Sequence, residues 1–395
     1  MAGRVAIIGA GPTGLDAALA CRERGLLPTV YEASPRPAAA IRDWGHVRMF
    51  TPWEMNVSSR MRRALATAGE PVPAGDGLPT GHELADRLLD PVARLPELAP
   101  RLRLRTAVKA VGRRGLTKDE EIGTAERARR PFRLLVEGPE GERVEEADAV
   151  LDCTGIWGNP NSLGDAGIPA PGEEALGHRI ERRLPAFADD PGDWAGRTIL
   201  LAGAGHSAQT AASDLARLAA DAAGTRVIWA VRNHAPDWDA VEGDPLPQRA
   251  ALVAEAERLR GGGSPAIDMR LGSAVEALSE RAGRIVVTLR NGEAEDVEVD
   301  RVLSLTGGVG DNRLYRQLQV HECYATCGPM SLSAALLGSG AGDCLEQQSH
   351  GAEALRVPEP NFFMLGSKSH GRYGLYLMRI GYDQVDDVMG VLAAS

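Results

Sequence analysis

The fold of the N-terminal region is indicated by residues 4–25, which read RVAIIGAGPTGLDAALACRERG. A β-branched apolar run at 5–8 precedes a glycine-rich turn and an Ala/Leu-rich stretch with helical spacing, which ends at Gly25. A second strand is expected at 29–31, and Glu32 lies at its end. This order of strand, turn, helix and strand predicts a βαβ unit.

The turn GAGPTG has the spacing of a dinucleotide-binding fingerprint. Gly9 allows the tight turn, Gly11 lets the backbone approach a pyrophosphate, and Gly14 allows close packing of helix on strand. The free N–H groups and positive dipole end of the helix bind anions without a lysine. Glu32 follows Gly14 by 18 residues, near the roughly 20 expected for the carboxylate that accepts ribose hydroxyl groups. We therefore predict a dinucleotide site, and the alternative is a glycine turn without a nucleotide.

The same pattern recurs at residues 197–233, RTILLAGAGHSAQTAASDLARLAADAAGTRVIWAVRN. Strands are expected at 198–202 and 226–231, with a helix from about 208 to 223 between them. The turn keeps Gly203 and Gly205 and has Ala208 in place of the third glycine, which is a tolerated variant. The chain therefore contains two nucleotide-binding units.

The second unit differs from the first at the end of its second strand, where Arg232 replaces an acidic residue. A guanidinium there pairs with a 2′-phosphate, which a carboxylate would repel. Arg232 therefore favours NADPH over NADH, and the alternative is an exposed arginine without a ligand.

Between and after the two units the pattern is weaker. A helix is expected at 82–95 and strands at 101–105, 132–136, 149–152 and 302–305. Asn291-Gly292 suits a type I′ hairpin turn. The Gly- and Pro-rich stretches at 158–172 and 261–265 are interpreted as a linker and a loop.

The length, charge and composition of the chain argue against several classes of protein. A chain of 395 residues predicts two or three domains at roughly 150 residues each. A net charge of −10 argues against nucleic acid as a partner. The sequence has no apolar run long enough to span a membrane and no signal peptide, so we expect a cytoplasmic protein. Five cysteines are an odd number, and free thiols are expected.

The two units, together with CysThrGly at 153–155 and ThrGlyGly at 306–308, resemble the two-dinucleotide-binding-domain flavoproteins. That superfamily includes thioredoxin-reductase-like enzymes and flavin-containing (class B) monooxygenases. The stretches WGHVRMFTPWEMN (44–56) and FFMLGSKSHGRYGLYLMRIGYDQV (362–385) are similar to bacterial flavoproteins found beside arsenic-resistance genes.

This resemblance implies an α/β fold of two Rossmann-like three-layer domains, with the NADPH domain inserted in the FAD domain. The expected boundaries are 1–160 and 301–395 for the FAD domain and 161–300 for the NAD(P)H domain. The implied cofactors are FAD and NADPH. The segment after Gly366 is expected to run beneath the flavin and to begin a last helix near 373–375, with its positive end toward the reduced ring. The predicted cofactor-binding residues are Gly9, Gly11, Pro12, Thr13, Gly14, Glu32, Arg48, Val108, Thr154, Gly155, Gly203, Gly205, His206, Ser207, Ala208, Arg232, Gly307, Gly366 and Arg372.

The chain also departs from the motifs of the superfamily. The monooxygenase signature FxGxxxHxxxW would precede the second unit, where the chain offers His178 but no tryptophan four residues later. The NADPH unit contains no CxxC pair of the thioredoxin-reductase type.

Asn56 is the candidate catalytic residue, because the resemblance places it where an amide donates to a flavin peroxide. The alternative is a structural role, in which Asn56 caps or turns the helix-like stretch that follows. Trp44, His46, Arg48 and Trp53 are candidates to line the flavin or the substrate, or to pack in the core.

The segment HECYATCGPM contains two cysteines four residues apart. Cys323 and Cys327 are open to three interpretations: a redox pair, metal ligands together with His321, or buried inert thiols. No second pair with zinc spacing accompanies them, although Cys344 and His350 follow.

We predict an FAD-dependent, NADPH-using monooxygenase that uses O₂ to oxygenate a nitrogen, sulfur or similar soft centre of a small-molecule substrate through C4a-hydroperoxyflavin. One alternative is a flavin reductase of a disulfide, quinone or other acceptor. A second alternative is a non-catalytic nucleotide-binding redox sensor. The sequence is compatible with a homodimer.

Overall fold

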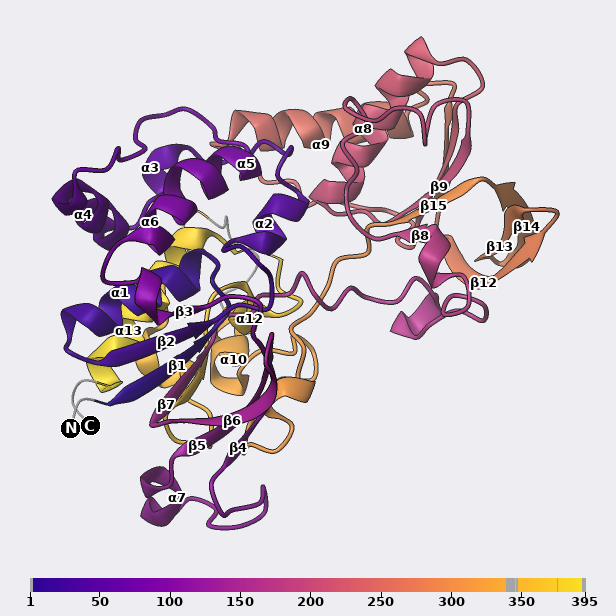
Figure 1. Cartoon of the computed structure of the whole chain (residues 1–395). Helices are drawn as coiled ribbons and strands as arrows, with labels where there is room; N and C mark the ends of the chain where they lie inside the picture. Colours follow the sequence, from indigo (N-terminus) through magenta and orange to yellow (C-terminus); the bar gives the residue numbers. More distant parts are fainter. Residues whose placement is uncertain (1–2, 339–344, 346, 375, 393–395) are drawn as a thin grey trace. The chain divides into compact units, whose positions relative to one another are not determined.

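The computed structural model describes residues 3–338, 345, 347–374 and 376–392. They form two compact units, a first unit of Met1–Asn159 with Gly308–Ser395 and a second unit of Pro160–Gly307. Each unit has a parallel β-sheet, a three-stranded antiparallel sheet and helices (Figure 1). This confirms the predicted α/β class with two Rossmann-like units.

The first unit is built on a five-stranded parallel sheet of order β16-β7-β1-β2-β3. Its strands are β1 (Arg4–Ile8), β2 (Leu27–Tyr31), β3 (Leu102–Arg103), β7 (Ala149–Asp152) and β16 (Phe362–Met364). The helices of this unit are α1 (Pro12–Glu23), α2 (Ala39–Asp43), α3 (Trp53–Asn56), α4 (Ser59–Ala68), α5 (Gly81–Leu84), α6 (Asp90–Arg94), α7 (Ala125–Arg129), α10 (Met330–Gly338), α11 (Gly351–Leu355), α12 (Ser367–His370) and α13 (Met378–Leu392).

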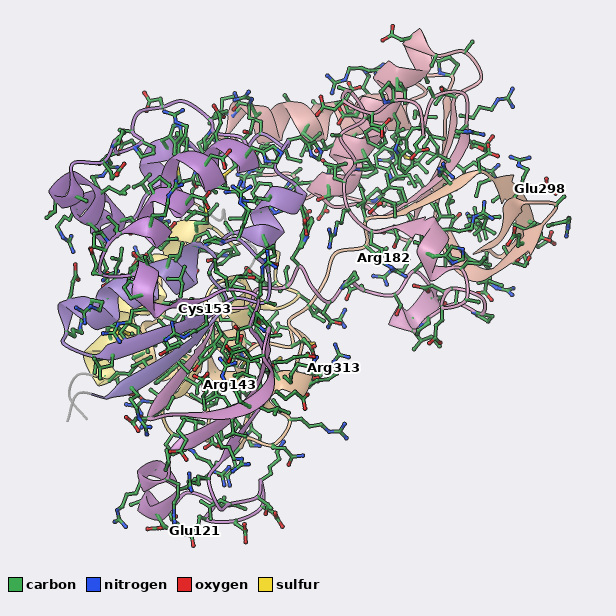
Figure 2. All side chains as sticks on the ribbon, viewed as in Figure 1. Glu121, Arg143, Cys153, Arg182, Glu298 and Arg313 are labelled. Carbon is green, nitrogen blue, oxygen red and sulfur yellow. The ribbon has the colours of Figure 1, made fainter. Side chains whose placement is uncertain are left out.

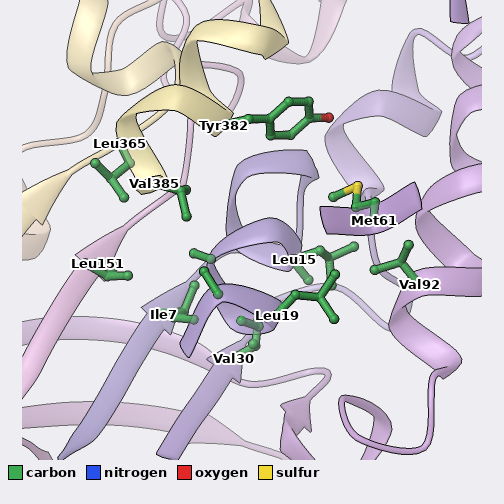
Figure 3. Close-up of a cluster of buried hydrophobic side chains, with 14 of the residues drawn as sticks. Ile7, Leu15, Leu19, Val30, Met61, Val92, Leu151, Leu365, Tyr382 and Val385 are labelled. Carbon is green, nitrogen blue, oxygen red and sulfur yellow. The ribbon is translucent and has the colours of Figure 1, made fainter. Parts of the chain in front are cut away.

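Alternation along β1 builds two hydrophobic cores, because successive side chains of a strand point to opposite faces. Val5 and Ile7 face the helical side, where Leu15 of α1 and Val385 of α13 belong to the same buried cluster (Figure 3). Ala6 and Ile8 face the antiparallel sheet of β4 (Ala107–Arg113), β5 (Phe132–Gly138) and β6 (Gly141–Ala147). The first unit therefore has three layers.

A buried carboxylate fastens the β4–β5 connection to the loop before β16. Glu359 accepts hydrogen bonds from Arg113 (Nε, 2.6 Å) and Arg127 (Nη2, 2.7 Å), and all three side chains are at most 1% exposed. Glu359 also accepts from the Gln319 backbone N–H at 2.8 Å. Three segments far apart in sequence thus meet at one carboxylate.

The second unit repeats the layering around a parallel sheet of order β11-β10-β9-β15-β8. Its strands are β8 (Ile180–Glu181), β9 (Thr198–Ala202), β10 (Arg226–Val231), β11 (Ile267–Leu271) and β15 (Arg301–Ser304). An antiparallel sheet of β12 (Ala274–Arg281), β13 (Arg284–Asn291) and β14 (Glu293–Val299) shares a core with it. The helices α8 (His206–Asp221) and α9 (Pro247–Arg260) complete this unit.

Several element predictions are corrected by the structure. The helix expected at 82–95 forms as one uninterrupted helical run, in which α5 and α6 are joined by a π-helical turn at Ala85–Leu89 that the sequence does not predict. The hairpin at 284–299 forms, but only Gly292 of the Asn291-Gly292 pair has a positive φ, so the turn is not type I′. The second unit extends to Gly307, past the expected boundary at 300, because β15 pairs with β9.

No helix among the described residues is long and apolar enough to cross a membrane.

Candidate functional site

In the first glycine turn two of the three glycines have no room for a side chain, and the third has free space beside it. Gly9 has φ +102°, and a Cβ there would lie 2.7 Å from the Cys153 carbonyl oxygen. A Cβ at Gly14 would overlap the Gly9 carbonyl oxygen. A Cβ at Gly11 would meet nothing within 4 Å. The protein itself thus requires Gly9 and Gly14, whereas Gly11 borders space at the N-terminus of α1, where Pro12 begins the helix.

Glu32 lies where the prediction placed it, directly after β2. Its carboxylate accepts the Ala10 N–H and the Ser34 N–H at 2.9 Å each, so the glycine turn itself orients it. The Glu32 carbonyl accepts the Thr106 N–H at 2.8 Å. Val108, two residues further on in β4, is thereby kept near this end of the sheet.

The N-termini of α1 and α13 lie side by side. Thr13 Oγ1 lies 3.4 Å from the Tyr376 hydroxyl, which precedes α13. A Cβ at Gly381, in the first turn of α13, would lie 2.6 Å from Thr13 Oγ1 and 3.5 Å from the Gly366 Cα. Two positive helix ends therefore meet beside Gly366. The helix begins at Met378, later than the expected 373–375, and Leu375 lies outside the described residues.

A buried ion pair that the sequence analysis missed lies at the end of β7. Lys368 Nζ donates to Asp152 Oδ2 (2.5 Å), Thr154 Oγ1 (3.1 Å) and the Asp311 carbonyl (2.9 Å). Lys368 is 1% exposed. Thr154 also donates to Asp152 at 2.7 Å. The predicted Thr154 and Gly155 are thus held next to α12, and Figure 2 labels Cys153 just before them.

Asn56 does not have the predicted catalytic geometry. Its amide nitrogen donates to the carbonyl oxygens of Thr51 and Pro52, each at 2.9 Å, and its carbonyl oxygen accepts the Thr51 hydroxyl at 2.9 Å. An amide nitrogen has only two hydrogens, so none remains for a ligand. Asn56 instead holds the turn at 51–56, which corrects the catalytic assignment, and Ser58 caps α4.

The other aromatic and basic residues at 44–53 differ in burial. Trp53 is 4% exposed, with the Arg87 guanidinium 5.1 Å from its ring centroid. Trp44 packs against the core of the first unit, and His46 is half-buried. Arg48 is exposed and donates to the Leu78 carbonyl at 2.6 Å. Core packing therefore accounts for the two tryptophans.

The second glycine turn has the same division of roles as the first. Gly203 has φ +129°, and a Cβ there would overlap the Leu305 carbonyl oxygen. Ala208 is fully buried. A Cβ at Gly205 would meet nothing within 4 Å. Gly205, like Gly11, precedes a helix N-terminus and borders space.

The residues around this turn differ in exposure. Ser207 is exposed, and His206 is half-buried at the start of α8. Burial lowers the pKa of His206. Arg232 is exposed directly after β10, as predicted. Gly307 has φ +77° and its carbonyl accepts the Asn161 N–H at 2.9 Å. These residues all belong to the second unit.

The segment after Gly366 contains a buried imidazole and an exposed guanidinium. His370 is 2% exposed, lies 3.2 Å from the Ser369 hydroxyl, and packs edge-on to Tyr376 at 5.1 Å between ring centroids. Burial lowers the pKa of His370 to about 4. Arg372 is exposed, and its N–H donates to the Thr326 carbonyl at 2.7 Å.

The described cysteines are all free thiols, with Cys21 and Cys323 buried and Cys153 and Cys327 half-buried. Cys344 lies outside the described residues. Within the described part of the chain, no group of three or more His, Cys, Asp or Glu side chains is arranged to hold a metal. The interpretation of His321, Cys323 and Cys327 as metal ligands is therefore not supported.

A cavity of about 310 Å³ opens between α3, α4 and α13. Its lining residues are Glu54, Met55, Val57, Ser58, Ser59, Arg60, Arg379, Tyr382, Asp383 and Asp386. None of the predicted cofactor-binding residues is among them, and we assign the cavity no role.

Comparison with known proteins relates this geometry to flavoproteins at the level of fold. The chain is similar to the bacillithiol disulfide reductase Bdr of Bacillus cereus, with 20% identity and a TM-score of 0.71 over 100% of this chain and 99% of that one. It is similar to an ornithine N-hydroxylase of Kutzneria sp. 744 in complex with reduced FAD, NADP⁺ and L-ornithine, with 16% identity and a TM-score of 0.63 over 99% and 100%. A flavin monooxygenase of Stenotrophomonas maltophilia matches with 18% identity and a TM-score of 0.59 over 100% and 98%. No family model and no curated protein matches the sequence.

Proposed function

We propose that the chain is an FAD-dependent, NADPH-using oxidoreductase, with FAD bound by the first unit and NADPH by the second. The observation that carries the proposal is the matched pair of turns. In each turn the first and third small residues, Gly9 and Gly14 or Gly203 and Ala208, are closely packed within the protein. The middle glycines, Gly11 and Gly205, border space at a helix N-terminus.

The first unit fits FAD. Gly11 and the N–H groups that begin α1 would hold the pyrophosphate, and Glu32 would accept the ribose hydroxyl groups. The carboxylate is already oriented by the Ala10 N–H. The adjacent N-termini of α1 and α13 supply positive potential beside Gly366, where an anionic flavin ring would be stabilised.

The second unit fits NADPH. Gly205 and Ser207 would hold the pyrophosphate at the start of α8, and exposed Arg232 would pair with the 2′-phosphate. Burial keeps His206 neutral near pH 7, because it lowers the pKa of the imidazole.

Within this class we favour oxygenation of a nitrogen, sulfur or similar soft centre of a small molecule. Bound FAD would accept electrons from NADPH and pass them to O₂. The fold-level likeness to an ornithine N-hydroxylase and a flavin monooxygenase supports this choice. So does the absence of a CxxC pair from the sequence of the second unit. Cytoplasmic location and an association with arsenic-resistance genes stay predictions.

A disulfide reductase is the second candidate, because a bacillithiol disulfide reductase matches the fold with a TM-score of 0.71. In that case electrons would pass to an external disulfide, and O₂ would not be consumed in turnover.

The test is anaerobic reduction of the FAD-loaded protein by NADPH, followed by rapid mixing with O₂ or with a small disulfide while flavin absorbance is followed. Rapid reoxidation by O₂, with a yield of H₂O₂ that falls when the substrate is added, supports the monooxygenase. Reoxidation by the disulfide alone supports the reductase. A protein that binds no FAD on titration excludes both.

A further inference from the structure

Cys323 and Cys327 lie at the two ends of one closed turn. The Cys327 N–H donates to the Cys323 carbonyl at 2.7 Å, and the Cys323 N–H donates to the Gly328 carbonyl at 2.9 Å. With standard backbone dimensions, the first hydrogen bond keeps the two Cα atoms within about 6.6 Å. A disulfide requires a Cα separation of roughly 4.4–6.8 Å. The backbone therefore already satisfies the Cα requirement, and closing the disulfide needs the two Cβ atoms to come within roughly 3.5–4.5 Å of each other.

The Cys323 sulfur lies among hydrogen-bond donors. The backbone N–H groups of Thr326 and Ala325 and the hydroxyls of Thr326 and Ser333 stabilise its thiolate and lower its pKa. These two hydroxyls are themselves 2.5 Å apart. Since the thiolate is the form that attacks oxidants, Cys323 is suited to oxidation.

Two other thiols of the chain provide an internal contrast. Burial raises the pKa of Cys21 to about 12, and it raises the pKa of Cys153 well above its usual range. Neither thiol is activated, so both serve as unreactive references in the same protein.

The turn is also accessible and strained. Tyr324, next to Cys323, is 95% exposed, and Ala325 is exposed. Cys327 is half-buried and has φ +64°, a left-handed conformation that non-glycine residues rarely adopt. The exposed residues Tyr324 and Ala325 therefore open the turn to a small oxidant next to Cys323, whose own side chain is 6% exposed.

We propose that Cys323 and Cys327 are an oxidation-sensitive dithiol that closes to a disulfide in the presence of hydrogen peroxide. The Cys323 thiolate attacks one peroxide oxygen, so that an S–O bond forms, the O–O bond breaks, and hydroxide leaves with a proton as water. The Cys327 thiol then attacks the resulting sulfenic sulfur, an S–S bond forms, and a second water leaves. Two thiols lose two electrons and two protons, and one peroxide becomes two waters.

The turn is joined to the segment that follows Gly366. The Thr326 carbonyl accepts the Arg372 N–H at 2.7 Å, and a Cβ at Gly371 would overlap that carbonyl oxygen. A Cβ at Gly328 would overlap the Ser369 carbonyl oxygen. Closing the disulfide therefore acts on residues 369–372. An effect of the disulfide on flavin reduction would depend on the proposed function. Formation of the disulfide does not depend on it.

The experiment is thiol mapping of the full chain. A single tryptic peptide, 317–356, carries Cys323, Cys327 and Cys344, so the mapping uses a Cys344→Ser background. The reduced protein is titrated with H₂O₂, denatured, alkylated with N-ethylmaleimide and digested. We expect this peptide to lose both alkylation sites together and to weigh two hydrogens less. Dithiothreitol should restore both sites, while Cys21 and Cys153 stay fully alkylated.

Single variants separate the steps. Cys327→Ser should stop at a sulfenic acid on Cys323, which dimedone traps, whereas Cys323→Ser should leave Cys327 alkylated at the same peroxide dose. The proposal is overturned if both thiols stay alkylated in the Cys344→Ser protein, or if Cys323 oxidises no earlier than Cys21. Because the assay reads thiols and not turnover, its failure is distinguishable from a failure to bind FAD or NADPH.

Discussion

Gly11 and Gly205 offer a paired test of the two nucleotide sites, because neither is needed for the packing of its own turn. We expect Gly11→Val to abolish FAD binding, since the added methyl groups would occupy the approach to the pyrophosphate. Gly205→Val should retain FAD and lose reduction by NADPH. Absorbance at the flavin band and NADPH oxidation rates report the two outcomes.

A control for this pair comes from the neighbouring glycines. Gly14→Val should reduce the yield of folded protein, because its Cβ would overlap the Gly9 carbonyl oxygen. If Gly11→Val melts as early as Gly14→Val, Gly11 serves packing and the assignment of the pyrophosphate site fails.

Arg232 should distinguish the two nicotinamide coenzymes. Arg232→Ala removes the guanidinium proposed to pair with the 2′-phosphate, a loss on the order of 1.5–3 kcal/mol for a charged hydrogen bond. The KM for NADPH should rise by at least tenfold while the KM for NADH stays nearly unchanged. Equal effects on both coenzymes would show that Arg232 is only a surface cation.

His370 should make the free energy of unfolding depend on pH. Burial lowers its folded pKa to about 4 from an ordinary value of 6.5. As pH falls below 6.5 the unfolded chain gains a proton at His370 that the folded chain does not, so the contribution of His370 to stability declines between pH 6.5 and 4, by up to about 3 kcal/mol. Urea unfolding of His370→Gln should lack this decline, and exposed His321→Gln should retain it.

At the scale of elements, Glu359 is the contact that fastens the antiparallel sheet of the first unit. Glu359→Ala leaves two buried guanidinium groups without their carboxylate, and breaking such a pair costs about 3–5 kcal/mol. We expect a lower unfolding midpoint and new protease cleavage within 114–130. Glu126→Ala removes only exposed ion pairs and should change stability by less than about 1 kcal/mol.

The elements that the sequence predicts well are those whose signals are local. Both glycine turns and the strands around them form as expected, because a βαβ unit has its hydrophobic period, turn and helix start within 30 or so residues. The helix at 82–95 also has local signals, the capping box of Thr80 and Glu83 and apolar residues at helical spacing, whereas the π-turn inside it has none.

The contacts that escape sequence reasoning join distant positions. Lys368 and Asp152 are 216 residues apart, and only a lysine within an apolar, glycine-rich stretch hints at a buried partner. A related reason explains why the role of Asn56 differs from the one that the sequence predicts. Its partners, the carbonyl oxygens of Thr51 and Pro52, are backbone groups that no residue pattern displays.

At the scale of the whole molecule, the two nucleotides should protect different units. A ligand at 100 times its Kd stabilises the state that binds it by about 2.7 kcal/mol. In hydrogen exchange, FAD should slow amides near 9–15 and 32–34, and NADP⁺ should slow amides near 203–209 and 231–234. Protection of the first region by NADP⁺ alone would contradict the assignment of the nucleotides to the two units.

The interrupted order of the first unit affects how the chain folds during synthesis. Residues 4–152 leave the ribosome without β16, which pairs with β7, and without α13, which packs on α1. The edge of β7 and one face of α1 therefore stay uncovered until β16 (Phe362–Met364) and α13 (Met378–Leu392) have been synthesised. Meanwhile Pro160–Gly307 is continuous and can fold on emergence. A nascent chain stalled before residue 360 is thus expected to expose an aggregation-prone strand edge in its first unit although its second unit is already folded.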